Sequence, residues 1–265
     1  MKVFKSLMLA GAAALTLAAC GGGNDVAAEL GISKPVVRYI HAIPAGPTVD
    51  FFNNNVLAQG SVSYEFVSGY NSFSSGATTL SYNTAGAGPT NPLASAGPFN
   101  AANGHEYTGI ALVSSTLTPA LTIIDDPFDK GLLNDQARLR VFNASVNANA
   151  GGAVDVYVIA GSATNPDITS VTPQLANVAY NAAVPASGSD SIYVDGGTYV
   201  VIVTDAGSKT ELFRSAPFSL SNNADWLLVT VPTTGLSGLT ADAINLLVAN
   251  NAAGNGTLLT NAAAQ

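Results

Sequence analysis

The sequence is poor in the residues on which most catalytic and nucleic-acid-binding sites depend. It contains one cysteine and two histidines in 265 residues, and its charged share is 10%, against a typical share of about 25%. A single cysteine excludes a disulfide scaffold and cysteine-based zinc sites. Nine basic side chains against seventeen acidic ones give a net charge of −8, which repels phosphate and disfavours nucleic acid as a partner.

Three further absences narrow the possible functions. No apolar run reaches the roughly 20 residues that a transmembrane helix needs. No glycine-rich phosphate loop follows a strand and opens a helix, so nucleotide binding has no support. No serine lies in a G-x-S-x-G elbow, and we expect His41 to hydrogen-bond a turn, since Asn143 stands at the matching position further along the chain. The sequence therefore predicts a protein that is not an enzyme.

The first twenty residues are typical of an export signal. Lys2 and Lys5 precede a short apolar segment, Leu7–Leu17, which fits a signal-peptide core. Leu17-Ala18-Ala19-Cys20 resembles the lipobox of bacterial lipoproteins, and this resemblance implies cleavage before Cys20 and attachment of lipid, such as palmitate, to its sulfur. An ordinary signal peptide that contains a cysteine is the alternative. Residue 21 is glycine and not the aspartate that would favour retention in the inner membrane, so the resemblance implies transfer to the outer membrane. Whether the protein then faces the periplasm or the exterior is left open.

The mature chain is dominated by short β-rich runs separated by turn residues. We expect residues 1–19 to be the signal peptide, 20–34 a lipidated tether, 35–130 and 131–250 two domains, and 251–265 a low-complexity tail that frays. Ser61–Phe66 alternates, which places Val62, Tyr64 and Phe66 on one buried face. Asn83–Gly104 is predicted to be a long loop or irregular edge, and Ala241–Ala249 a helix or a broken strand.

An internal repeat predicts the architecture. Residues 37–52 parallel residues 139–158: Arg38 matches Arg140, and Val49-Asp50 match Val154-Asp155. The offset is about 100 residues, the size of one immunoglobulin-like sandwich. We therefore expect an all-β protein with two tandem immunoglobulin-like antiparallel β-sandwich domains after a lipoprotein signal peptide. The repeated pattern resembles domain-of-unknown-function family 4397, which implies β-sandwich repeats in exported proteins, often lipoproteins, and carries no catalytic residues.

Two groups of charged residues are candidate sites. The repeated arginines and aspartates predict a structural pair in each domain, Arg38 with Asp50 and Arg140 with Asp155. Acidic residues gather between the two domains, and they are either a solvated linker or a weak calcium site; the candidate ligands are Asp125, Asp126, Asp129 and Asp135. The spacing fails the EF-hand pattern, and we expect no other cofactor.

Two functions remain open. The first is a non-enzymatic cell-envelope lipoprotein, bound to the membrane through its lipid, whose domains are a binding or structural module for a protein or polysaccharide partner. The second is an enzyme or enzyme accessory domain that acts on cell-wall or extracellular glycan. Burial of several ionisable groups in one cleft favours the second, and a smooth surface with scattered acids favours the first. Because the segment 83–104 has no ionisable side chain, we expect it to bind a partner without chemistry.

Overall fold

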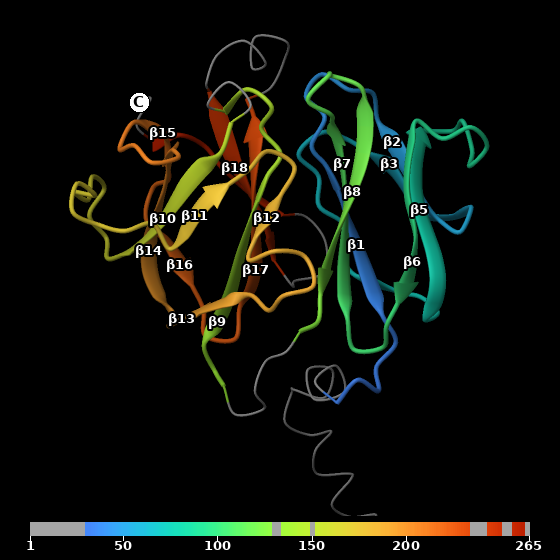
Figure 1. Ribbon diagram of the computed structural model, residues 1–265, viewed down its shortest axis with the longest axis horizontal. Helices are drawn as coiled ribbons and strands as arrows, with labels where there is room; N and C mark the ends of the chain where they lie inside the picture. Colours follow the sequence, from blue (N-terminus) through green and yellow to red (C-terminus); the bar gives the residue numbers. More distant parts are fainter. Residues whose placement is uncertain (1–29, 129–133, 149–151, 234–242, 251–255, 263–265) are drawn as a thin grey trace, which may run out of the picture.

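Four β-sheets form the regular structure of the computed structural model (Figure 1). The structure describes residues 30–128, 134–148, 152–233, 243–250 and 256–262. Every named element within these ranges is a strand, so the all-β expectation is confirmed. No helix in this part of the chain is long and apolar enough to cross a bilayer.

The first half of the chain forms sheets A and B. Sheet A has the strand order β4-β1-β7-β8, and sheet B has the order β3-β2-β5-β6. The bounds in sheet A are β1 (Val36–His41), β4 (Asn71–Ser72), β7 (Glu106–Val113) and β8 (Pro119–Asp126). The bounds in sheet B are β2 (Val49–Asn53), β3 (Val56–Val62), β5 (Gly76–Thr84) and β6 (Ala94–Ala101).

The second half forms sheets C and D. Sheet C has the order β12-β9-β17-β18-β19 with β13 also on β9, and sheet D has the order β11-β10-β14-β15 with β16 also on β14. The bounds in sheet C are β9 (Ala137–Asn143), β12 (Ala183–Val184), β13 (Ile192–Val194), β17 (Asp225–Pro232), β18 (Ile244–Asn250) and β19 (Thr257–Leu259). The bounds in sheet D are β10 (Val154–Ala160), β11 (Leu175–Val178), β14 (Gly197–Asp205), β15 (Glu211–Arg214) and β16 (Phe218–Leu220).

Strand pairing in the second half repeats that in the first. β2 pairs with β3 and β5 as β10 pairs with β11 and β14, and β7 pairs with β8 as β17 pairs with β18. The expectation of purely antiparallel sheets is wrong at one place in each half, since β1 lies parallel to β7 and β9 lies parallel to β17. Parallel neighbours require a long crossover, and here the strands of the outer sheet supply it.

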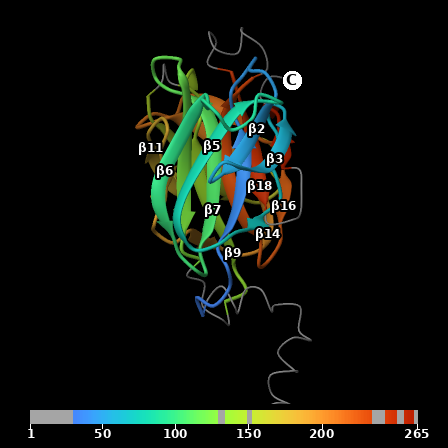
Figure 2. The same ribbon diagram turned by 90° about the vertical axis from the view of Figure 1, so that its right-hand side faces the viewer.

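The four sheets lie as layers in the order B, A, C, D (Figure 1). Figure 2 looks onto sheet B at one end of this stack. Each contact between layers has its own apolar core: Phe51 and Tyr82 lie between sheets B and A, Ile110 and Val229 between A and C, and Phe213 between C and D. Because sheets A and C share a core, the two halves pack face to face and are not joined by a linker alone.

Local expectations hold at two segments, 83–104 and 241–249, and are wrong at two others. The segment 83–104 contains an irregular edge strand, β6, which is one of its two predicted alternatives. Thr257–Leu259 of the expected fraying tail instead pairs with β18. The alternation of 61–66 ends at Val62: Tyr64 packs on the core between sheets A and C, whereas Phe66 packs on the core between A and B. Positive φ angles at Ser61 and Glu65 break the period there. Of the segment 241–249, residues 244–249 lie in strand β18.

Candidate functional site

The facing surfaces of sheets A and C change from charged to apolar along four strands. In β1, Arg38 precedes Ile40 on this face, and in β17 Asp225 precedes Leu227. β7 and β9 follow the same rule, with Glu106 and Arg140 before the apolar residues. Because side chains alternate along a strand and these four strands run in one direction, the charged residues near their starts meet at one end of the shared core. The alternation in each strand is thus the sequence signal for this site.

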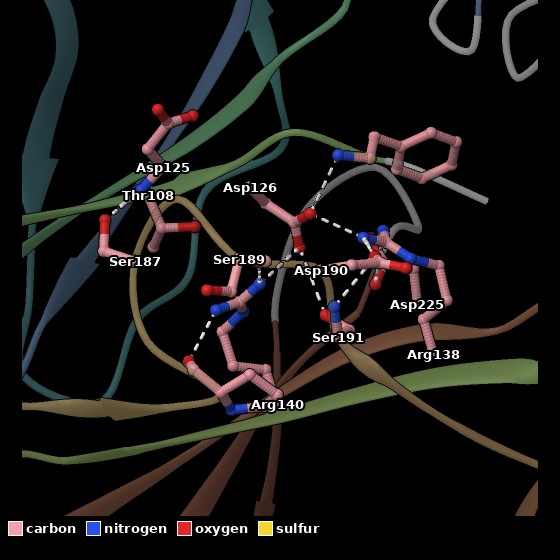
Figure 3. Close-up of polar contacts among 12 residues, drawn as sticks. Thr108, Asp125, Asp126, Arg138, Arg140, Ser187, Ser189, Asp190, Ser191 and Asp225 are labelled. Atoms are coloured by element: carbon pink, nitrogen blue, oxygen red, sulfur yellow. Dashed lines mark hydrogen bonds and ion pairs between the residues drawn. The ribbon is translucent and has the colours of Figure 1, made fainter.

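Arg138 lies at the centre of the charged cluster. Its side chain is 1% exposed, and its guanidinium stacks on the Phe128 ring, 4.4 Å from the centroid. The guanidinium donates to Asp126 and to Asp190 at 2.8 Å, and its Nη1 lies 3.3 Å from Asp225 Oδ1. Figure 3 shows these carboxylates around Arg138. Burial alone would lower the pKa of Arg138, but the charges of Asp225 and Asp126 outweigh it and raise the pKa, so this arginine is permanently charged.

Two further arginines complete the network. Arg140 lies 3.5 Å from Asp126 Oδ2 and donates to the backbone carbonyls of Pro185, Ala186 and Ser189. Burial opposes ionisation of Asp126, but Arg138 and Arg140 outweigh it and lower the pKa of that carboxyl. Arg38, from the other half, donates to Thr108 Oγ1 at 3.0 Å and to Ala249 O at 3.2 Å. The network therefore joins β1 of sheet A to β18 of sheet C.

Glu106 and Asp225 form a carboxyl pair across sheets A and C. Asp225 is 6% exposed, and the two carboxyls hydrogen-bond each other. Burial, and then the negative charge of Asp225, raise the pKa of Glu106 to about 8. Burial also raises the pKa of Asp225. Two carboxyls so close in a low-dielectric site do not both ionise, so the pair holds one proton at neutral pH.

The space within this network is too small for a substrate. The cavity has a volume of about 10 Å³ and is lined by Arg38, Tyr70, Thr108, Ile124, Asp126, Arg140, Ser191, Asp225, Trp226 and Leu227. That volume accommodates one water molecule. The ionisable groups are therefore buried together, but between sheets and not in a cleft that a glycan could enter.

The expected Arg–Asp pairs are wrong. Within the described residues neither Arg38 nor Arg140 contacts its expected aspartate, because the arginines lie in sheets A and C whereas Asp50 and Asp155 lie in sheets B and D. Asp50 accepts the backbone N–H of Ser61 at 2.7 Å and of Gly86 at 2.8 Å.

Asp155 has the matching contacts in the second half. It accepts the backbone N–H of Asn177 at 2.7 Å and of Gly207 at 2.8 Å. Each aspartate thus braces a neighbouring strand on one side and a turn on the other, and it does so with its own two carboxylate oxygens.

Comparison with protein families adds one finding to this geometry. The model of the domain of unknown function DUF4397 matches residues 35–157. These residues contain a DUF4397 domain. No protein with a curated description matches the chain. The DUF4397 match begins just before β1 and ends within β10, so it passes the expected domain boundary at residue 130 and includes Arg38, Asp50, Arg140 and Asp155.

His41 of the DUF4397 domain stabilises a turn, as expected. Its Nδ1 accepts the Ile43 N–H at 3.2 Å, which leaves Nε2 to donate to Pro47 O at 2.9 Å. Asn143 reproduces both contacts: its Oδ1 accepts the Ser145 N–H at 3.2 Å, and its Nδ2 donates to Gly152 O at 3.4 Å. The imidazole of His41 and the amide of Asn143 thus make the same two kinds of hydrogen bond to backbone groups of the turn that follows.

The candidate calcium ligands are not brought together by the described residues. Asp125 pairs with His105 at 2.7 Å, Asp126 is engaged by two arginines, and Asp129 lies outside the described residues, as does Cys20. Within the described ranges, no group of three or more His, Cys, Asp or Glu side chains could hold a metal ion, so Asp125, Asp126 and Asp135 do not form one. Arginines already neutralise Asp126, which is the physical reason that it is not free for a cation.

Proposed function

We propose that this protein is a non-enzymatic cell-envelope lipoprotein that presents a rigid β-stack as a binding or structural module to a protein or polysaccharide partner. One observation carries the proposal: a cluster of arginines and acidic residues lies between sheets A and C around a cavity of about 10 Å³, which is too small for a substrate. Charges that satisfy one another there hold layers together and are not available to a substrate. What remains for function is the outer surface.

The surface that we assign to the partner lies at the end of the strands opposite the first described residues. The first described residues run beside the β6–β7 turn, where Ser33 O accepts the Gly104 N–H. The loop between β5 and β6, residues 85–93, lies at the opposite end of the strands, still within the sheet B half (Figure 1). The side chain of Asn83 donates to Gly88 O, Thr90 O and Asn91 O. A loop fixed in this way binds with a low entropic cost.

We also propose that the second half is a diverged second copy of the DUF4397 domain, with both copies immunoglobulin-like sandwiches. Three correspondences support this: the repeated strand pairing, the matching contacts of Asp50 and Asp155, and those of His41 and Asn143. Tandem copies joined at sheets A and C give one body in which the two halves lie side by side.

The anchor is tested at Cys20. We propose that this residue carries lipid at the outer membrane, since multiple acyl chains anchor durably. In a bacterium with two membranes, Cys20→Ala should abolish labelling by palmitate and release the protein from the membrane fraction, while the control Gly22→Ala leaves both unchanged. Retained label and retained outer-membrane partition in Cys20→Ala would exclude this anchor.

The Glu106–Asp225 pair is the observation that favours the alternative, an enzyme or accessory domain acting on glycan, since paired carboxyls hydrolyse glycosidic bonds when a cleft exposes them. The test is release of reducing ends from cell-wall and extracellular glycans by the purified protein. We expect none. Release that disappears in Glu106→Gln would replace the binding module with this enzyme.

A further inference from the structure

The charge balance of the buried network is the starting point. Three arginines, Arg38, Arg138 and Arg140, face four acidic residues, which are Glu106, Asp126, Asp190 and Asp225. With every acid ionised the cluster would carry one excess negative charge in a largely buried site, where the Asp190 side chain is 26% exposed, and such an excess is costly. One proton held by the Glu106–Asp225 pair removes that excess.

No other described group can supply the missing positive charge. The groups facing Glu106 are Arg38 from β1, Tyr70 from the segment before β4, Asp126 from β8 and Asp225 from β17. Arg138 and Arg140 of β9 already contact Asp126, and Arg138 Nη1 also lies 3.3 Å from Asp225 Oδ1. His105, the chain neighbour of Glu106, pairs with Asp125. The cavity of about 10 Å³ has room for one water and not for a hydrated cation.

The carboxyl pair bridges the two halves of the molecule. Glu106 begins β7 of sheet A, and Asp225 begins β17 of sheet C. Tyr70 hydrogen-bonds Glu106 from the segment before β4, and Glu106 and Asp225 hydrogen-bond each other through the shared proton, so loss of that proton breaks the hydrogen bond between the two carboxyls. We propose that the contact between sheets A and C is a proton-dependent lock, closed while Glu106 and Asp225 share one proton and loosened when that proton leaves.

The direction of the pH dependence follows from the raised pKa of Glu106. A carboxyl whose pKa is higher in the folded state stabilises the fold at low pH, and this contribution is lost as pH rises through the folded value, about 8. Stability therefore falls between about pH 5 and pH 8, where only the folded state holds the proton. In the native protein the lock itself opens near pH 8.

Trp226 offers a direct readout. It is the single tryptophan of the chain, it follows Asp225, and it lines the cavity. We expect its fluorescence in the purified protein to change in one step near pH 8 when pH is raised from 6 to 9.5. Glu106→Gln and Asp225→Asn should each remove the step, because either change leaves three acids for three arginines. The double variant should be less stable than either single variant, because it leaves only two.

Two controls separate this lock from other titrations. Glu211→Gln removes a carboxyl that pairs with Arg214 outside the network, and it should keep the step. His105→Gln should keep it too. A step absent from the wild type, retained in Glu106→Gln, or lost in His105→Gln would overturn the proposal.

A second measurement holds even if a variant does not fold. Amide hydrogen exchange of the wild type, corrected for the intrinsic rate, should accelerate between pH 7 and pH 9 at the first residues of β7 and β17, and not in β5 of sheet B. Uniform or unchanged protection across these strands would contradict the lock.

Discussion

At the scale of single residues, Asp50 and Asp155 show how one carboxylate determines a strand's path. The N–H groups that they accept belong to residues with positive φ: Ser61 and Asn177 in neighbouring strands, and Gly86 and Gly207 in turns. Such residues turn their N–H groups away from the regular ladder, and a buried unpaired N–H is costly. The repeat in the sequence identified these aspartates as structural, but not their partners, since the bulges that they brace have no sequence signature.

Replacing either aspartate should destabilise the fold. Asp155→Ala leaves two N–H groups without acceptors, and we expect a loss of about 3 kcal/mol in the free energy of unfolding, measured by urea denaturation. Asp50→Ala should cost a similar amount. Asp167→Ala is the control, because this exposed aspartate accepts hydrogen bonds from the nearby Thr169, and it should unfold like the wild type. Equal stability of Asp155→Ala and the control would show that the two hydrogen bonds accepted by Asp155 do not stabilise the fold.

At the scale of elements, composition left open what packing decides. Glycine and proline in the segment 83–104 predict a long loop or an irregular edge, and the edge forms because Ala94 and Phe99 of β6 pack on the core between sheets A and B. The register shift between Thr78 and Leu80 accommodates this irregular edge strand, as bulges do. The short β19 was missed for the same reason: it is held by β18 and not by its own propensity.

Asn83 should hold the β5–β6 loop in place. Asn83→Ala removes the donor to three loop carbonyls, so the loop should become mobile while the strands persist. Limited proteolysis should then cut within residues 85–93, which stay resistant in the wild type. Asn100→Ala, an exposed change in β6, should leave the resistance intact. A loop that is cut equally in all three proteins would show that Asn83 does not fix it.

At the scale of the whole molecule, the sequence predicted the strands and the internal repeat, but not the contact between the halves. The alternation of side chains along each strand is the sequence signal for this contact. Arg38, Glu106 and Asp225 occupy the same face of their strands as the apolar residues that follow them. Such charges near strand ends are expected to be solvated when one sheet is considered alone. Only the packing of sheet A on sheet C makes them partners.

This contact makes the two halves one structural body. Sheets A and C share an apolar core that includes Ile110, Phe142 and Val229, and the arginine network closes one end of it. Separating the halves would expose that core and leave buried charges unpaired, so neither half should unfold alone.

Differential scanning calorimetry of the purified protein at pH 6, where the carboxyl pair holds its proton, tests this central claim most directly. We expect a single transition whose calorimetric enthalpy equals its van't Hoff enthalpy. Two separate transitions, or a calorimetric enthalpy about twice the van't Hoff value, would mean that the halves unfold independently, and would contradict the account.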